Sequence, residues 1–264
     1  YEISERLNGH LDKDQLAHYK FNILMLNPLL YMELHGILYD TPLAKQRLAQ
    51  VQSYYYQHQY QLDVAAGCGF DYSLSRQELL NQVKFICCYK RDSSIPKKEF
   101  EDVYYQVEDR LKNPADLTDA DKGFINVACK NIMNTKSDIF KDYLYRRLNL
   151  PIQQAKDPKT KELHESTNYE SLLKIQKTQP HKSVELALEI GELRTRAQML
   201  EIYSDKDGRI RCGYNIVGTE TGRLTCYTSP TGSGYNLQTI PSESSLRPET
   251  HPLHAGMRDL FIAD

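Results

Sequence analysis

The chain of 264 residues carries 33 Lys and Arg against 35 Asp and Glu, a net charge of −2, and 40% of its residues are hydrophobic. This composition fits one large or two modest folded domains, and the near-neutral charge excludes a wholly basic nucleic-acid coat. No apolar run approaches the roughly 20 residues of a membrane span, so we expect no membrane association. The six cysteines show no CxxC and no Cys/His ligand spacing, which argues against a disulfide framework or a zinc site. Tyr1 opens directly into a charged helical pattern, so we expect no secretory signal and a cytoplasmic protein.

The charge is unevenly spread along the chain. Residues 1–129 carry 14 basic against 18 acidic side chains, whereas residues 130–182 carry 11 basic against 6 acidic. A locally basic segment in an acidic protein can face phosphates, although such a segment on its own is more often a solvated face.

Residues 1–60 are expected to be helical, because apolar side chains recur there at three- and four-residue steps: Leu7, Leu11, Leu16, Tyr19, Ile23, Leu26, Leu30 and Leu34. Gly36 is the expected stop, and residues 37–40 form a short extended piece. We predict that Thr41 caps the next helix, with Pro42 at its first position.

Gly67-Cys68-Gly69 breaks that helix, and several shorter helices follow up to about residue 149. The polar, turn-rich residues 152–165 predict a surface loop or short hairpin. Two further helices are expected at about 169–177, after Ser166-Thr167-Asn168, and at about 183–203.

The character changes after the turn pair Asp207-Gly208. Residues 209–217 and 222–227 are predicted to be strands, residues 228–252 a Gly- and Pro-rich loop, and Met257–Ala263 the start of another element. The fold class is therefore mostly α, with a helical body leading into the first strands of a mixed domain.

The most informative stretch contains four ordered pieces: residues 208–210 (GRI), 214–215 (YN), 219–224 (TETGRL) and 236–241 (NLQTIP). Gly beside Arg in the third piece lets backbone come close to a partner while a guanidinium reaches past it. Two amides spaced two apart on an extended segment would point the same way. Arg, Asn and Gln are the residue types that bind base edges, so the set favours nucleic-acid contact, with an ordinary turn as the alternative.

The ordered set resembles the thumb-to-palm segment of family A (bacterial polymerase I-like) DNA polymerases. The resemblance extends backward: LNPLLYMELHGILYDTPLAKQRL resembles the opening helices of the polymerase domain, and FKDYLYRRLNLPIQQAKDPKTKELHESTNYESLLKI resembles the thumb. Tyr1–Leu16 is similar to the last helix of the adjoining 3′–5′ exonuclease domain. Residues of about 60–130 have no clear counterpart and look like an insertion of the kind found in phage or plasmid relatives.

This resemblance implies a domain order along the chain. Residues 1–22 would be the end of the exonuclease-domain helix and 23–60 the start of the polymerase domain. A helical insertion (61–130) would follow, then the thumb (131–207), then the thumb-to-palm segment with the first strands of an α+β palm (208–264).

The resemblance also implies roles for individual residues. Arg223, in the T-G-R-L motif, would reach into the minor groove near the primer terminus, whose acceptors are nearly sequence-blind. Asn236 and Gln238 would contact the template strand or nearby backbone. The alternatives are a structural ion pair for Arg223 and satisfaction of loop backbone for the two amides.

Further DNA contacts are implied for Thr219, Thr221 and Thr225 along the sugar–phosphate chain, and for Arg194 and Arg196 on a thumb helix. The two arginines could instead be exposed helix charges. Where the family usually has Ser-Ser, this chain has Thr-Cys at 225–226, and the loop before residue 236 is longer, so the loop contacts are open.

The carboxylates that hold two metal ions in a polymerase are not among the matched residues, and in the family they lie beyond residue 264. We therefore expect no catalytic and no metal-binding residue here, and no cofactor beyond the Mg²⁺ that the complete enzyme would use with dNTPs. The chain is interpreted as the primer–template-binding part of a DNA-directed DNA polymerase, a replicative nucleotidyltransferase of a bacterial or phage-infected cell. Two alternatives stay open: a stand-alone DNA-binding or processivity subunit of a split polymerase, and a helical interaction protein without DNA affinity.

Overall fold

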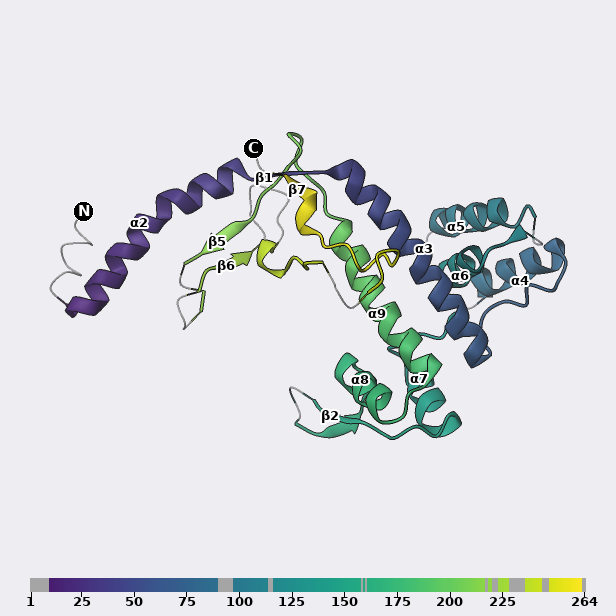
Figure 1. The fold of residues 1–264 in the computed structure, drawn as a ribbon. Coiled ribbons are helices and arrows are strands. Elements are labelled where there is room, and N and C mark those ends of the chain that lie inside the picture. The colour runs from purple at the N-terminus through teal and green to yellow at the C-terminus, as the bar shows by residue number, and fades with distance from the viewer. Residues whose placement is uncertain are drawn as a thin grey trace. The chain divides into compact units, whose positions relative to one another are not determined.

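The computed structural model describes residues 10–89, 97–113, 116–157, 159, 161–216, 218–219, 223–227, 236–243 and 247–262. α-Helices dominate this part of the chain, and its strands are short and antiparallel (Figure 1). The prediction of a mostly α chain is confirmed at this level. The chain divides into two compact units, one formed by residues 1–48 with 198–264 and the other by residues 49–197.

The first long helix of the residue 1–48/198–264 unit is α2 (Lys13–His35), and both of its ends follow from local sequence. The Asp12 side chain accepts the backbone N–H groups of Asp14 and Gln15, and the Gln15 side chain bonds back to Asp12, which makes a capping box. Gly36 ends the helix at φ +70°, as predicted, and a Cβ there would lie 2.8 Å from the Ile210 carbonyl oxygen.

The apolar side chains of α2 are mostly exposed. Within the helix only Leu29 is buried, whereas Leu24 is 74% exposed and Tyr31 65%. The predicted stripe is present, but its described members after Tyr19 are also about half exposed: Ile23, Leu26, Leu30 and Leu34. A helix that is apolar on several faces is typical of buried positions, whereas most large apolar side chains of this one are exposed.

A three-stranded antiparallel sheet joins distant parts of the same unit. The central strand β1 (Ile37–Tyr39) lies between β4 (Arg209–Ile210) and β7 (Phe261–Ile262). The short 3-10 turn η4 (Arg258–Leu260) leads into β7. Residues 37–39, between α2 and α3, are therefore held beside residues more than 160 positions later in the sequence.

The predicted N-cap of α3 (Thr41–Ala66) is wrong by one residue. The Asp40 carboxylate accepts the backbone N–H of Leu43 at 2.9 Å, so Asp40 caps the helix and Pro42 takes its second position. The Thr41 hydroxyl lies 3.3 Å from the Ser204 hydroxyl instead. Pro42 still costs the helix no hydrogen bond, because the N–H groups of the first turn have no intrahelical partner.

The predicted strands at 209–217 and 222–227 are shorter and belong to two sheets. β4 ends at Ile210, and the chain then enters β5 (Gly213–Asn215), which pairs with β6 (Thr225–Tyr227). The break falls at Arg211, whose guanidinium donates to the Leu34 carbonyl of α2 at 2.8 Å. Because the Arg211 side chain bonds to the end of α2, the strand ends here, and the alternating sequence pattern does not predict this break.

The first of two cores in the residue 49–197 unit lies among five elements. They are the end of α3, α7 (Asp138–Asp142), the π-helical turn η2 (Tyr143–Arg147), α8 (Tyr169–Thr178) and α9 (Lys182–Leu200). Buried side chains from each meet there, among them Leu62, Phe140, Leu144, Leu172, Ile175 and Ile190. Asn168 caps α8 by accepting the Ser171 N–H at 2.8 Å, so the helix begins where the sequence predicted.

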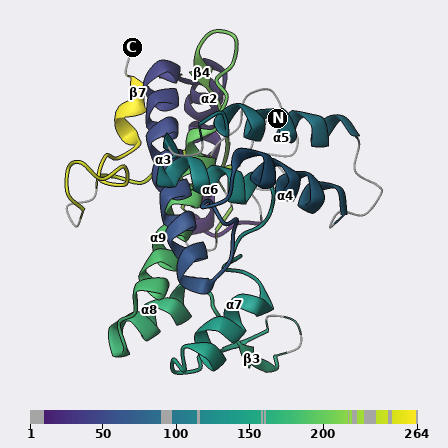
Figure 2. The same ribbon diagram turned by 90° about the vertical axis from the view of Figure 1, so that its right-hand side faces the viewer.

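A second core in the same unit belongs to residues 70–129. Figures 1 and 2 show α4 (Arg76–Tyr89), α5 (Lys97–Arg110) and α6 (Asp119–Ala128) packed side by side. The core contains buried apolar residues from each of them and from the loops: Phe70, Leu79, Leu80, Val83, Val107, Leu111, Ile125 and Cys129. The segment with no counterpart in the family pattern therefore has apolar packing of its own.

A buried carboxylate ties this three-helix segment to α3. Asp63 is fully buried and accepts three N–H donors: the Gln59 side chain at 2.8 Å, the Asn126 side chain at 2.9 Å and the Met133 backbone at 2.8 Å. Burial raises the pKa of Asp63 to about 6, although all three donors act to lower it.

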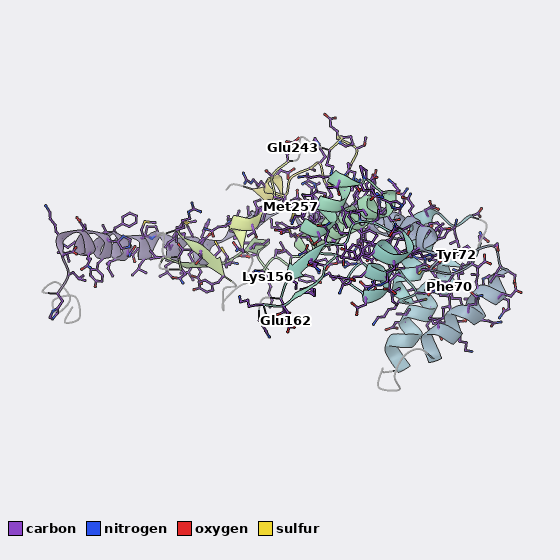
Figure 3. The ribbon with its side chains drawn as sticks, turned by 90° about the horizontal axis from the view of Figure 1, so that it is seen from below. Phe70, Tyr72, Lys156, Glu162, Glu243 and Met257 are labelled. Atoms are coloured by element: carbon purple, nitrogen blue, oxygen red, sulfur yellow. The ribbon has the colours of Figure 1, made fainter. Side chains whose placement is uncertain are left out.

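Asn126 extends the network to the loop that follows α3. Its carbonyl oxygen accepts the Tyr72 hydroxyl at 2.9 Å and the Phe70 backbone N–H at 3.3 Å. Tyr72 and Phe70 are labelled in Figure 3. Gly69 has φ +90°, and a Cβ on it would lie 2.5 Å from the Asn126 side-chain nitrogen, so glycine is required at this contact.

Candidate nucleic-acid interface

Six of the predicted DNA-binding residues lie on or after the β5–β6 hairpin, in the residue 1–48/198–264 unit, and the structure describes five of them. The hairpin pairs Gly213 with Tyr227 and Asn215 with Thr225. The turn that joins the strands carries the T-G-R-L motif, and Thr221 within it lies outside the described residues. Figure 1 shows the two strands side by side.

Thr219 braces the residue that was expected to reach the minor groove. Its hydroxyl oxygen accepts the Arg223 backbone N–H at 2.9 Å and lies 3.1 Å from the Arg223 carbonyl oxygen, to which the hydroxyl donates. The Thr219 hydroxyl therefore bonds both backbone polar groups of Arg223, four residues later in the chain. This contact makes Thr219 a support for Arg223 within the turn.

The Arg223 side chain itself is exposed. No ion pair joins its guanidinium to any residue that the structure describes, so the structural ion-pair alternative has no support there. A fixed backbone with an outward guanidinium is the arrangement expected of an arginine that binds an external acceptor.

Thr225 begins β6 and packs against the backbone of Gly218, just before the motif. A Cβ on Gly218 would lie 2.0 Å from the Thr225 hydroxyl oxygen, so the glycine at 218 makes room for this side chain. Thr225 is half-buried, which leaves part of its surface open beside the turn.

The two predicted amides bond to loop backbone. Asn236 accepts the Gln238 backbone N–H at 3.1 Å and caps the 3-10 turn η3 (Leu237–Thr239). The Gln238 side-chain NH₂ donates to the Leu224 carbonyl at 2.6 Å. The expectation that they lie two apart on an extended segment and point the same way is wrong, because the segment folds into a turn. The alternative, in which the amides satisfy the loop, describes these bonds.

Arg194 and Arg196 lie on α9 and cannot share one face, because residues two apart on a helix point about 200° apart. Arg194 packs across to α3: its guanidinium carbon lies 5.7 Å from the Tyr55 ring centroid, and Nη2 donates to the Tyr55 hydroxyl at 3.4 Å. Both arginines are half-buried. Arg194 therefore has a structural role within the residue 49–197 unit.

The basic segment contributes an exposed hairpin to that unit. β2 (Gln154–Lys156) pairs with β3 (Leu163–Glu165), which confirms the hairpin alternative at 152–165. Lys156, Lys159 and Lys161 are exposed, and no ion pair joins them to a described residue. Figure 3 labels Lys156 and Glu162 on this hairpin. Other basic side chains of the segment are paired, such as Arg146 with Asp142 at 2.9 Å and with Glu165 at 3.2 Å.

The neighbouring carboxylates Asp205 and Asp207 are bound by an arginine. The Arg211 guanidinium donates to Asp205 at 2.6 Å and also to Asp207. The hydrogen bond from Arg211 holds the pKa of Asp207 at about 2. Among the described residues, no group of three or more His, Cys, Asp or Glu side chains could hold a metal ion.

The comparisons with known proteins give no family. No protein-family model matches this chain, and no curated protein is significantly similar to it. Across the described part of the chain, none of the helices combines the length and the apolar character that crossing a membrane would require.

Sequence reasoning missed two features of this unit. Arg211 was not singled out, although it bonds two carboxylates and the end of α2. Cys226 was noted only as a departure from Ser, and it is half-buried on β6 and paired with Tyr214 of β5. The alternation of Cys212, Tyr214 and, on the paired strand, Cys226 is the only signal in the sequence, and it requires the strand register to be known.

Proposed function

We propose that this chain is the primer–template-binding part of a family A-like DNA-directed DNA polymerase. The observation that carries the proposal is the ordered motif set in which Arg223 is exposed on a turn braced by Thr219. Minor-groove acceptors are common to all base pairs, so a guanidinium placed in this way would bind a duplex without reading its sequence.

The exposed lysines of the β2–β3 hairpin give the proposal a second, sequence-independent component. Lys156, Lys159 and Lys161 lie within or beside a three-residue-per-strand hairpin at the surface. Lysines on a protruding hairpin can follow a phosphate backbone and release bound counterions.

The parent enzyme would add dNTPs to a primer 3′ end, and the Mg²⁺ it needs would be held by residues other than those described here. Asp205 and Asp207 are occupied by Arg211, and Asp264 lies outside the described residues. We derive no catalytic step from this chain and expect it to be inactive in primer extension by itself.

The test is a fluorescence-anisotropy titration of a labelled primer–template with the chain at increasing KCl. We expect weak binding without sequence preference, and a log–log salt slope of about −0.9 for each phosphate contact. Replacing Lys156, Lys159 and Lys161 together by Gln should flatten the slope by about 0.9 for each lysine that contacts a phosphate. The matched control replaces the exposed lysines Lys13, Lys20 and Lys45 by Gln. Absence of binding at low salt, or a flat salt response, would refute the proposal.

The exposed apolar surface of α2 favours a second candidate, a helical interaction protein without DNA affinity. Leu24, Tyr31 and Leu34 are each at least 60% exposed, and such a surface is typical of protein contact. The same titration separates the two functions, because an interaction protein of this kind would show no salt-dependent binding of duplex DNA.

A further inference from the structure

Arg211 lies at the break between β4 and β5, where the chain leaves the three-stranded sheet and enters the hairpin. Its Nε donates to the Leu34 carbonyl at 2.8 Å, and Nη2 donates to the His35 carbonyl at 3.4 Å. Nη1 donates to Asp205 at 2.6 Å and to Asp207 at 3.1 Å, and Nη2 also donates to Asp207. These five bonds equal in number the N–H donors of a guanidinium, so one side chain joins three segments.

The acceptors on both sides of Arg211 suit a cation. The carbonyls of Leu34 and His35 belong to the last turn of α2, where carbonyls have no intrahelical donor and the helix dipole favours positive charge. Asp205 and Asp207 lie on the turn before β4, which the Gly208 N–H closes by donating to the Asp205 carbonyl at 2.9 Å. The Arg211 side chain is only 17% exposed, so the planar fork is held on both sides.

Gly36 makes room for the stem of the same side chain. Its φ is +70°, and a Cβ on it would lie 2.8 Å from the Cγ atom of Arg211. The aliphatic stem therefore passes directly over the residue that ends α2, and only glycine allows this approach. The end of the helix and the arginine at the strand break fit each other closely.

The position of Arg211 gives it leverage on the hairpin. β5 begins two residues later and contacts α2, and the turn with Arg223 lies beyond the end of β5 at Asn215. Four residues of extended chain span about 13 Å, so a rotation of about 10° at residue 211 would move the end of β5 by about 2 Å. Good hydrogen-bond distances vary by only about 0.5 Å, so such a shift would displace Arg223 from a base-edge acceptor.

We propose that Arg211 is a positioning residue, which sets the direction of the β5–β6 hairpin relative to α2 and so places Arg223 for duplex binding. The inference rests on the proposed function for its effect on DNA, whereas the effect on the direction of the hairpin is independent of that function.

The experiment compares two replacements of Arg211 with one control. Arg211→Met keeps the stem and removes all the donors, whereas Arg211→Lys keeps the charge and three donors without the planar fork. Lys206→Met is the matched control, because Lys206 is exposed on the turn between the two carboxylates and its replacement removes the same charge. Circular dichroism and thermal melting identify the variants that fold, and Arg211→Lys decides the question if Arg211→Met does not.

The first readout is the direction of the hairpin, measured by NMR residual dipolar couplings of amides in α2 and in β5–β6. We expect one alignment frame to fit both elements in the wild type and in Lys206→Met with unchanged relative orientation. In Arg211→Met the hairpin should rotate against α2 by about 10° or more, and in Arg211→Lys by less. An unchanged orientation in every folded Arg211 variant would overturn the positioning role, and a general loss of stability by itself would not produce the rotation.

The second readout is duplex affinity by anisotropy. Arg211→Met should bind several-fold more weakly, Arg211→Lys should recover part of the loss, and Lys206→Met should stay within about twofold of wild type. In an Arg223→Ala background, replacing Arg211 should have almost no further effect, because the two residues act through one contact.

An equal loss with and without Arg223 would overturn the positioning role, since Arg211 would then act on DNA independently of Arg223. A rotated hairpin with unchanged affinity would overturn it as well. If the wild-type chain binds no duplex, the proposed function fails and the role in DNA binding fails with it, while the dipolar couplings still decide whether Arg211 sets the direction of the hairpin.

Discussion

The hairpin that carries the T-G-R-L motif (residues 213–227) and the three-helix segment (residues 70–129) differ in where their polar side chains form hydrogen bonds. In and beside the hairpin, Thr219 and Gln238 bond exposed backbone of nearby loops. Next to the three-helix segment, the fully buried Asp63 of α3 accepts hydrogen bonds from α3, from α6 and from the loop that follows α6. Residues whose types resemble those of a binding site, Thr219 and Gln238, thus bond the backbone of nearby loops, while Arg223 stays exposed. In contrast, Asp63, which the sequence did not single out, connects two cores. Mutation of Asp63 should therefore lower stability, whereas mutation of the hairpin should lower DNA affinity and change stability little.

The largest expected effect is on stability, from Asp63→Ala. Removing the carboxylate leaves the donors of Gln59, Asn126 and Met133 buried without their acceptor, so the free energy of unfolding should fall by about 3 kcal/mol or more. Chemical denaturation followed by circular dichroism measures this. Thr219→Val is the comparison variant, since its hydroxyl bonds exposed backbone and its loss should cost about 1 kcal/mol or less. Equal losses in the two variants would break the contrast between the regions.

The pH dependence of stability sharpens the same contrast. The folded pKa of Asp63 is about 6, above the ordinary value of 3.8, so the folded chain keeps a proton that the unfolded chain loses. This contribution is full below pH 3.8 and is lost as pH rises to about 6, by up to about 3 kcal/mol. Denaturation across this range should show the loss in wild type and not in Asp63→Asn. A wild-type profile that matches Asp63→Asn would show that the donors keep Asp63 ionised.

In the hairpin, the expected effect is on DNA binding. Arg223→Ala should weaken primer–template affinity by about tenfold, in the range of 1–3 kcal/mol for a base-edge contact, with an unchanged melting temperature. Arg223→Lys keeps the charge and should recover part of the affinity, because lysine lacks the planar fork. Lys45→Ala removes an exposed charge from the same unit and should change affinity by less than about twofold. A melting temperature that falls together with the affinity would assign Arg223 to the fold.

The smallest effect is expected for Arg194→Met. The replacement keeps an apolar stem against Tyr55 and removes a contact worth about 0.5–1 kcal/mol of stability. Duplex affinity measured by anisotropy should stay within about twofold of wild type. A loss as large as that of Arg223→Ala would show that Arg194 leaves Tyr55 to bind DNA.

The sequence could predict those elements whose signals are local. Gly36 ends α2 with a positive φ, Asn168 caps α8 by accepting an N–H from three residues later, and polar turn residues mark the β2–β3 hairpin. The N-cap at Asp40 was missed because Asp and Thr are adjacent and both are good caps. The ends of β4 and β5 depend on Arg211, which donates to the Leu34 carbonyl 177 residues away. A local sequence pattern cannot predict so distant a partner.

The candidate site divides in the same way. Residue types and order were enough to single out Arg223, which is exposed as required. The roles of Asn236 and Gln238 depended on whether residues 236–239 form an extended segment or a turn, and the same sequence is compatible with both conformations. The pairing of Cys226 with Tyr214 could not be predicted, because it needs the register of β5 with β6.

The apolar surface of α2 also decides how the chain will behave in solution. Eight of its large hydrophobic side chains are exposed, and the helix carries few charges to keep neighbouring molecules apart. Raising the protein concentration would bring such surfaces together, and salting-out ions such as sulfate would strengthen their association. Dilute samples without sulfate, with a mild detergent below its micelle concentration, are therefore the conditions in which the binding of DNA can be measured without competing self-association.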